Sequence, residues 1–98
     1  MVTFVNRFTV TGPPEEFERL FEETSAFFVE RPGFLTHRLV RHGDLPGHYV
    51  NVAEWEDEES FRAAVTHPAF APHAAALRKL STSEPNLYPV TVLERRAA

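Results

Sequence analysis

The chain has 98 residues, of which 43% are hydrophobic and 24% are charged, a balance typical of one globular domain and not of a disordered segment. Its net charge of −4 and its lack of any long Lys/Arg run argue against nucleic-acid binding, which requires a basic surface. The sequence has no cysteine, no signal-peptide pattern and no apolar run near the roughly 18 residues of a membrane span. We therefore expect a cytoplasmic protein without disulfides, thiolate metal sites or a membrane partner.

The predicted elements begin with a strand over residues 2–10, VTFVNRFTV, in which β-branched and aromatic residues are frequent. Because side chains alternate along a strand, one of its faces carries Phe4, Asn6 and Phe8. Gly12 and the prolines after it end the strand, and the acidic residues that follow favour a helix start. The helix is predicted to extend to Pro32-Gly33. Its buried stripe comprises Phe17, Leu20, Phe21, Thr24, Phe27 and Phe28.

A hairpin is predicted next, with strands over residues 33–42 and 48–56 joined by the turn GDLPG, residues 43–47. Asp57 can cap a second helix, which His67-Pro68 interrupts. The apolar faces of its two pieces comprise Phe61, Ala64 and Val65, then Phe70, His73, Ala74, Leu77 and Leu80. Residues 86–94, NLYPVTVLE, are predicted to form the last strand, with Pro89 at a sheet edge or a bulge.

The element order β-α-β-β-α-β predicts an α+β, ferredoxin-like fold, with the helices on one face of an antiparallel sheet. The opposite face has no partner within the chain. Its expected apolar residues are Val5, Val50, Val52, Val90 and Val92. Because an uncovered apolar sheet face is an association site, we expect a homodimer in which two sheets pack face to face.

The third strand places a polar amide among buried apolar residues. Its inward face carries Tyr49, Asn51, Ala53 and Trp55. A buried amide costs free energy unless it is hydrogen-bonded, so Asn51 needs a structural partner, such as a backbone carbonyl or Ser60, or a ligand. Trp55 either fills the core or directs its indole N–H to the same ligand. Two donors facing one aromatic-lined space would suit a phenolate or enolate oxygen.

The chain resembles the antibiotic biosynthesis monooxygenase family over nearly its whole length. The resemblance rests on ERPGFLTHRLVR, YVNVAEWEDEESFRAA and HPAFAPH, in this order, before a closing strand. It implies a dimeric α+β barrel, with residues 1–98 as one domain of this type. It also implies a reaction, because polyketide-tailoring members oxidise anthrone- or naphthacenone-like phenols to quinones with O₂ and without metal, flavin or haem.

The same resemblance suggests site residues. In such enzymes the Asn and Trp of NVAEW line a pocket between sheet and helices, which implies Asn51 and Trp55 here, and Asn6 matches a first-strand asparagine of some members. This chain has Phe61 where some members have a tyrosine. It has alanine at position 75, where they carry an arginine, with only Arg78 close by.

Other candidates come from the residues themselves. His73 is the best candidate base, because histidine titrates near neutral pH, although it could also be a satisfied core residue. The expected substrate-binding walls are Phe21, His37, Phe61, Phe70 and Leu77. The five histidines show no H-x-x-x-H or carboxylate pairing, so we expect no metal site.

The favoured hypothesis is a cofactor-independent monooxygenase that binds O₂ and a small aromatic, polyketide-like substrate. The alternative is a non-oxidative polyketide cyclase or a ligand-binding protein of the same fold. A haem-degrading branch of the family is a third possibility: Asn6 matches that branch. Its tryptophan would fall at about Ala64, however, and its iron-ligating histidine one residue after His73.

Overall fold

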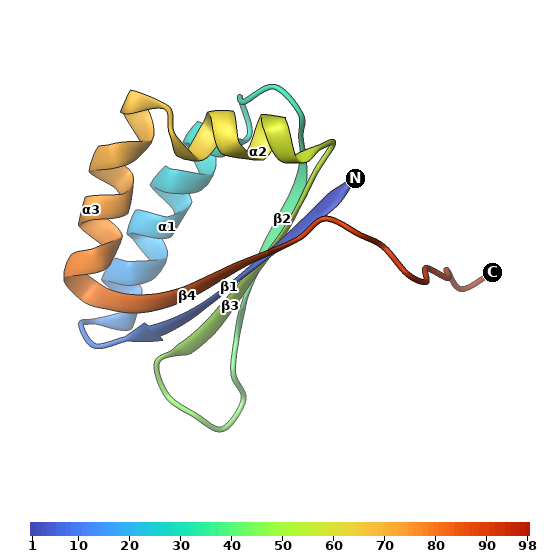
Figure 1. Cartoon of the computed structure of the whole chain (residues 1–98). Coiled ribbons are helices and arrows are strands. Elements are labelled where there is room, and N and C mark those ends of the chain that lie inside the picture. The colour runs from blue at the N-terminus through green and yellow to red at the C-terminus, as the bar shows by residue number, and fades with distance from the viewer.

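The computed structural model describes residues 1–98, in which four strands form one antiparallel sheet in the order β2-β3-β1-β4. The strands are β1 (Val2–Val10), β2 (Phe34–Arg41), β3 (His48–Trp55) and β4 (Ser81–Tyr88). The helices are α1 (Pro14–Phe28), α2 (Glu58–Val65), the short 3₁₀ turn η1 (Pro68–Phe70) and α3 (Ala71–Leu80). All the helices lie on the same side of the sheet (Figure 1). The predicted α+β, ferredoxin-like fold is therefore confirmed.

The predicted cap of α2 at Asp57 and the predicted helix break at His67 are both present in the structure. The side chain of Asp57 accepts a hydrogen bond from the Ser60 N–H at 2.7 Å and so caps α2. The hydrogen bonds from Ser60 also hold the pKa of Asp57 below its usual value. At the predicted break, His67 accepts a bond from the Ala69 N–H at 3.0 Å and begins the 3₁₀ turn. This break separates α2 from α3, so that each helix can meet a different part of the sheet.

The last strand is where the prediction is wrong. It spans Ser81–Tyr88 and not residues 86–94, and it begins directly after α3. As an edge strand it tolerates Pro85, because one side of its backbone needs no partner. Val90 and Val92 therefore lie beyond the sheet, exposed by 76% and 93%, and not on its outer face. Residues 89–98 carry no regular structure and extend away from the body of the domain (Figure 1).

A close contact at Gly33 fixes α2 beside the start of β2. Gly33 has φ +83°, and a Cβ at this position would clash with the Ser60 side chain. Its carbonyl also accepts a hydrogen bond from the Glu56 N–H at 2.8 Å. Only glycine combines a positive φ with the absence of a Cβ, which explains the Pro-Gly-Phe segment between α1 and β2.

The core on the helix-covered face of the sheet consists of two clusters. The first comprises Val2, Ala53, Trp55, Phe61 and Ala64. The second comprises Phe8, Phe17, Phe21, Tyr49 and Leu77. On β1 and β3 these clusters are separated by the residues at positions 6 and 51, which are both asparagines.

The outer face of the sheet has no covering element. Val5, Val50 and Val52 are half-buried there, as predicted, and Val40 on β2 adds to them with 45% exposure. Arg7 and Glu84 flank this apolar strip and form an ion pair at 3.8 Å. No helix in the structure has the length and apolar character needed to span a membrane.

Candidate active site

Two carboxamides face one another at the centre of the sheet. Asn6 on β1 pairs directly with Asn51 on β3, so their side chains lie on the same face, with Cβ atoms about 5 Å apart. The Oδ1 atoms of both residues are buried, and neither has a hydrogen-bond partner. The Ser60 hydroxyl, the one donor among the structural partners considered for Asn51, is therefore not used by its amide oxygen.

A cavity of about 450 Å³ lies above this pair, between the sheet and the helices. This volume is within the range of about 300–1,000 Å³ that small-molecule sites occupy. Six of the predicted site residues line it: Asn6, Asn51, Phe21, Phe61, Phe70 and Leu77. Six of the thirteen remaining lining residues are also hydrophobic, three of them phenylalanines, which suits a flat aromatic ligand.

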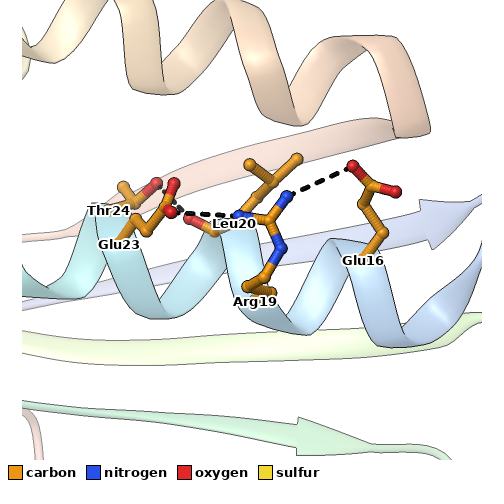
Figure 2. Close-up of polar contacts among 5 residues, drawn as sticks. All are labelled: Glu16, Arg19, Leu20, Glu23 and Thr24. Carbon is orange, nitrogen blue, oxygen red and sulfur yellow. Dashed lines mark hydrogen bonds and ion pairs between the residues drawn. The ribbon is translucent and has the colours of Figure 1, made fainter.

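Small residues on the surrounding elements leave the space open. Ala74 on α3, Thr24 on α1, and Ser81 and Ser83 on β4 all line the cavity. The Thr24 hydroxyl donates to the Leu20 carbonyl at 2.9 Å (Figure 2), and the Ser81 hydroxyl donates to the Leu77 carbonyl at 2.8 Å. Each of these two hydroxyls is hydrogen-bonded to a backbone carbonyl four residues earlier, whereas the two carboxamide oxygens have no hydrogen-bond partner.

Helix α1 presents a charged face on its other side. Arg19 bonds both Glu16, at 3.3 Å, and Glu23, at 3.0 Å, in a row along the exposed surface (Figure 2). These i,i+3 and i,i+4 pairs keep the acidic residues of the helix in solvent. The cavity side of α1 therefore stays free of charge.

Trp55 lies on the same strand face as Asn51, as the alternation predicts, but it does not line the cavity. It is 2% exposed, and its ring meets Phe28, Phe34 and Phe61 in edge-on contacts at 5.2–6.0 Å between centroids. Phe28 and Phe61 are cavity residues. Trp55 thus supports the wall from behind.

The two candidate histidines also lie outside the lining. His37 Nε2 is hydrogen-bonded to Ser25 Oγ at 2.6 Å, which joins β2 to α1. His73 is half-buried on α3 and packs against Phe27, with 5.9 Å between the ring centroids. The next residue, Ala74, occupies the cavity-facing position instead. The role of His73 as a base stays a prediction, and this position gives it no contact with the cavity.

Tyr49 is close to the site in sequence but turned toward other partners. Its hydroxyl donates to Glu18 Oε2 at 2.5 Å, and Arg41 lies 3.7 Å from the same carboxylate. Burial and the Glu18 carboxylate raise the pKa of Tyr49, with Arg41 opposing them. Tyr49 therefore stays protonated at neutral pH and holds α1 to β3.

The charged groups of the cavity are two arginines that the sequence did not single out as site residues. Arg62 on α2 and Arg78 on α3 both line it, and no Asp, Glu, Lys or His does so. Arg78 continues the cavity-facing stripe of α3 with Ala74, Leu77 and Ser81, at i, i+3, i+4 and i+7. That spacing was present in the sequence and could have identified it.

The sequence-based prediction did not identify the wall of the cavity that β4 forms. Ser83, Pro85 and Leu87 form this wall, and they pair with Phe8, Asn6 and Phe4 of β1. Residues 81–85, STSEP, have a low strand propensity, so the sequence favoured a loop there. Pairing with β1 outweighs that preference.

Comparison with known proteins agrees with this geometry. The family model described as "Antibiotic biosynthesis monooxygenase" matches residues 1–76. The chain belongs to the antibiotic biosynthesis monooxygenase family. It is 56% identical over 87 residues to the deoxynogalonate monooxygenase of Streptomyces nogalater, covering 89% of this chain and 74% of that enzyme. The crystal structure of SnoaB, a cofactor-independent oxygenase from Streptomyces nogalater, is 54% identical, with a TM-score of 0.89 over 95% of this chain and 97% of that one. The prediction of a monooxygenase of this family is confirmed.

A haem oxygenase of Mycobacterium tuberculosis is also similar, with 35% identity over 63 residues, 64% of this chain and 60% of that enzyme. The cavity of the present chain does not fit haem, because none of its lining residues is a His, Cys, Met or Tyr that could ligate iron. Elsewhere, no three His, Asp or Glu residues are grouped so that they could hold a metal ion.

We predict that the unpartnered amides lower stability. Replacing Asn6 or Asn51 by leucine, which has the same number and branching of side-chain heavy atoms, should raise the free energy of unfolding by about 1–3 kcal/mol per site, because a desolvated polar group is removed. The change would be measured by urea denaturation. Glu22→Leu, at an exposed position on α1 outside the cavity lining, is the control and should change stability by less than about 0.5 kcal/mol. A loss of stability in both core variants would show that the amides are satisfied in the free protein.

Proposed function

We propose that the chain is a cofactor-independent monooxygenase that oxidises a polycyclic phenol or anthrone-type polyketide intermediate to a quinone with O₂. The observation that carries this proposal is the facing pair Asn6 and Asn51, whose buried oxygens lack partners at the base of an apolar cavity. The 56% identical deoxynogalonate monooxygenase and the cofactor-independent oxygenase SnoaB support it.

The carboxamides suit a substrate oxygen that changes its protonation state. Each carries an acceptor oxygen and an N–H₂ donor. The N–H would donate to the substrate oxygen, most strongly once it is ionised, and a turn of the carboxamide would let its oxygen accept the phenol or enol O–H of the incoming substrate. In a water-poor site, a donor aimed at developing negative charge is commonly worth about 2.7–4 kcal/mol.

The substrate supplies most of the chemistry in this mechanism. Its hydroxyl, seated at the carboxamides, loses a proton to a water molecule that enters with the substrate, and the electron-rich anion transfers one electron to O₂. The two radicals join in a carbon–oxygen bond, and the protonated peroxide loses water to leave the new carbonyl. One oxygen atom of O₂ thus enters the product, and the other leaves as water together with two substrate hydrogens.

The protein has three tasks in this scheme. The apolar walls, among them Phe21, Phe61 and Phe70, hold the flat rings and exclude water. Asn6 and Asn51 favour the anion. Trp55 keeps Phe61 in place and acts as a positioning residue.

The rival function is non-oxidative cyclisation or ligand binding in the same cavity. An aldol-type ring closure needs a side chain that moves a proton, and the lining offers amides, hydroxyls and guanidinium groups. Product mass separates the two. Oxygenation adds one oxygen and removes two hydrogens, whereas cyclisation by dehydration removes one water.

We predict that the purified protein accelerates oxygen uptake by the anthrone dithranol in the presence of EDTA. Asn51→Ala should lower kcat by about 10²- to 10³-fold, because one oxyanion donor is lost. An oxygen electrode would follow the rate, and circular dichroism would confirm that the variant is folded.

His73→Ala tests the candidate base in the same assay: because His73 does not line the cavity, the variant should keep most of its activity, and a large loss of kcat would instead assign His73 the role of base. A rate in the native protein no higher than the spontaneous one would contradict oxygenation. An unchanged rate in Asn51→Ala would contradict the role of the carboxamides.

We also propose that the chain forms a homodimer through the outer face of its sheet. Val5, Val50 and Val52 form a half-buried apolar strip there with no covering element. Val90 and Val92 alternate just beyond β4, so a second copy offers them an apolar surface as well. A cytoplasmic location of this dimer stays a prediction.

Light scattering at micromolar protein should return about twice the chain mass of 11.2 kDa. Val52→Asp, at the centre of the strip, should shift the mass toward that of one chain, because a buried carboxylate would be unpaired. A native protein that scatters as a single chain would exclude this dimer.

A further inference from the structure

We propose that the chain has a second binding site, separate from the active-site cavity, for a small zwitterion that carries a carboxylate and an ammonium group, as amino acids do. The site is centred on Arg31, in the connection between α1 and β2. This inference does not depend on the proposed oxygenation, because it concerns other residues and another class of ligand.

A second cavity, of about 410 Å³, lies between α2 and the connection from α1 to β2. These two segments run side by side in the helix layer (Figure 1). The two cavities share no lining residue. The second one also lies away from the outer face of the sheet, so the proposed dimer leaves it accessible. Helix α2 lines it with a stripe at i, i+3, i+4 and i+7, which comprises Ser60, Ala63, Ala64 and His67.

The guanidinium of Arg31 is the observation that points to a ligand. Three buried side-chain polar atoms of the structure lack a hydrogen-bond partner: Arg31 Nε and the two carboxamide oxygens of the active site. The rest of the Arg31 guanidinium forms no hydrogen bond or ion pair either. A buried donor without a partner costs free energy, and a ligand can supply the missing bond.

Arg31 is held in place without being neutralised. Its Cζ lies 4.8 Å from the centroid of the Phe27 ring, in a cation–π contact. This contact uses the flat face of the guanidinium and leaves the N–H groups along its edge unbonded. The Phe27 ring also packs against His67, with 5.5 Å between the ring centroids, so two residues of the cavity rest on the same support. The donors of Arg31 are therefore positioned before any ligand arrives.

The same cavity carries acidic groups that do not pair with Arg31. Asp57 and Glu59 both line it, and neither forms an ion pair with the arginine. Asp57 accepts the Ser60 N–H at 2.7 Å, whereas the Glu59 carboxylate has no hydrogen-bond or ion-pair partner. Positive and negative groups thus line one cavity without meeting across it.

These opposite charges define the class of ligand. A simple anion would meet two carboxylates, and a simple cation would meet the arginine. A zwitterion satisfies both, because its carboxylate can accept parallel N–H bonds from Arg31 while its ammonium donates to Glu59. His67 adds a donor: its Nδ1 accepts the Ala69 N–H at 3.0 Å, which leaves Nε2 as the protonated nitrogen of the neutral ring.

Amino acids of increasing length test this assignment, because they vary the separation of the two charges. The zwitterionic probes are glycine, 4-aminobutanoate and 6-aminohexanoate. Each is compared with the acid and the amine of equal carbon number, for example hexanoate and hexylamine, which carry one charge each. Binding would be followed in NMR spectra of the ¹⁵N-labelled protein. The amides of Ala63 and His67 report the second cavity, and those of Asn6 and Asn51 report the active-site cavity.

At the length that fits best, the zwitterion should bind about tenfold more tightly than its acid or its amine, because it forms one more charged hydrogen bond. The amides of Ala63 and His67 should shift, and those of the two asparagines should not. Arg31→Gln should reduce the affinity to that of the amine, and Glu59→Gln should reduce it to that of the acid. Added salt should weaken the preference for the zwitterion.

Arg95→Gln and Glu22→Gln are the matched controls, since they remove the same charges at exposed positions outside the cavity. Both should leave the dissociation constants unchanged. Arg31→Lys, which keeps the charge but not the planar fork, should retain part of the preference. Circular dichroism would confirm that each variant is folded.

Three results would overturn the assignment: no zwitterion that binds more tightly than both of its analogues, an unchanged affinity in Arg31→Gln, or shifts confined to the active-site amides. None of these measurements involves oxygen uptake, so a failure of the proposed oxygenation would leave their outcome unchanged.

Discussion

The constraint on which this structure depends is a pair of buried amides that the fold leaves without partners. Asn6 and Asn51 face each other on adjacent central strands, where most domains would place two apolar side chains. Each unsatisfied polar atom costs about 1–3 kcal/mol, a sizeable part of the stability of a small domain. Such a cost is typical of a binding site, where a ligand supplies the missing bonds.

The rest of the fold is arranged around this pair. The two core clusters pack on either side of it, and small residues on α3 and β4 keep the space above it open. Gly33 holds α2 close to the sheet, and Trp55 holds Phe61. The resulting cavity combines apolar walls, two amides at its base and guanidinium groups at its rim, which suits an aromatic anion that reacts with O₂ largely by its own chemistry.

Much of this arrangement could be predicted because it follows from short-range periodicity. Strand alternation placed Asn6 and Asn51 on one face, and helical spacing identified Phe21, Phe61, Phe70 and Leu77 as inward-facing. Alternation could not tell that Trp55, although on the correct face, lies behind the wall, because this depends on how Phe28 and Phe34 pack around it. His73 misses the cavity by one helical position, a rotation that the apolar pattern alone did not resolve.

The errors at the end of the chain have a different origin. Residues 81–85 form a strand only because β1 offers an unpaired edge, which is long-range information absent from local composition. The segment that contains Val90 and Val92 has a more strand-like sequence than β4 itself, although both valines are exposed beyond the sheet. Misplacing β4 hid one wall of the cavity. Arg62 was passed over, and Arg78 was noted only as lying close to a position that other family members fill with arginine, because charged residues on helices usually face solvent.

The most direct test of the central claim is the pKa of a hydroxyl on a bound, unreactive ligand. The absorbance of danthron, the dihydroxyanthraquinone that corresponds to dithranol, followed against pH in the presence of saturating protein, gives this value. Apolar burial alone would raise the pKa of the hydroxyl, whereas amide N–H groups that donate to its oxygen would lower it. We expect a pKa lowered by about one unit or more on binding, and a rise above that of the free compound when both Asn6 and Asn51 are replaced by alanine. A pKa in the native protein at or above that of free danthron would contradict the account.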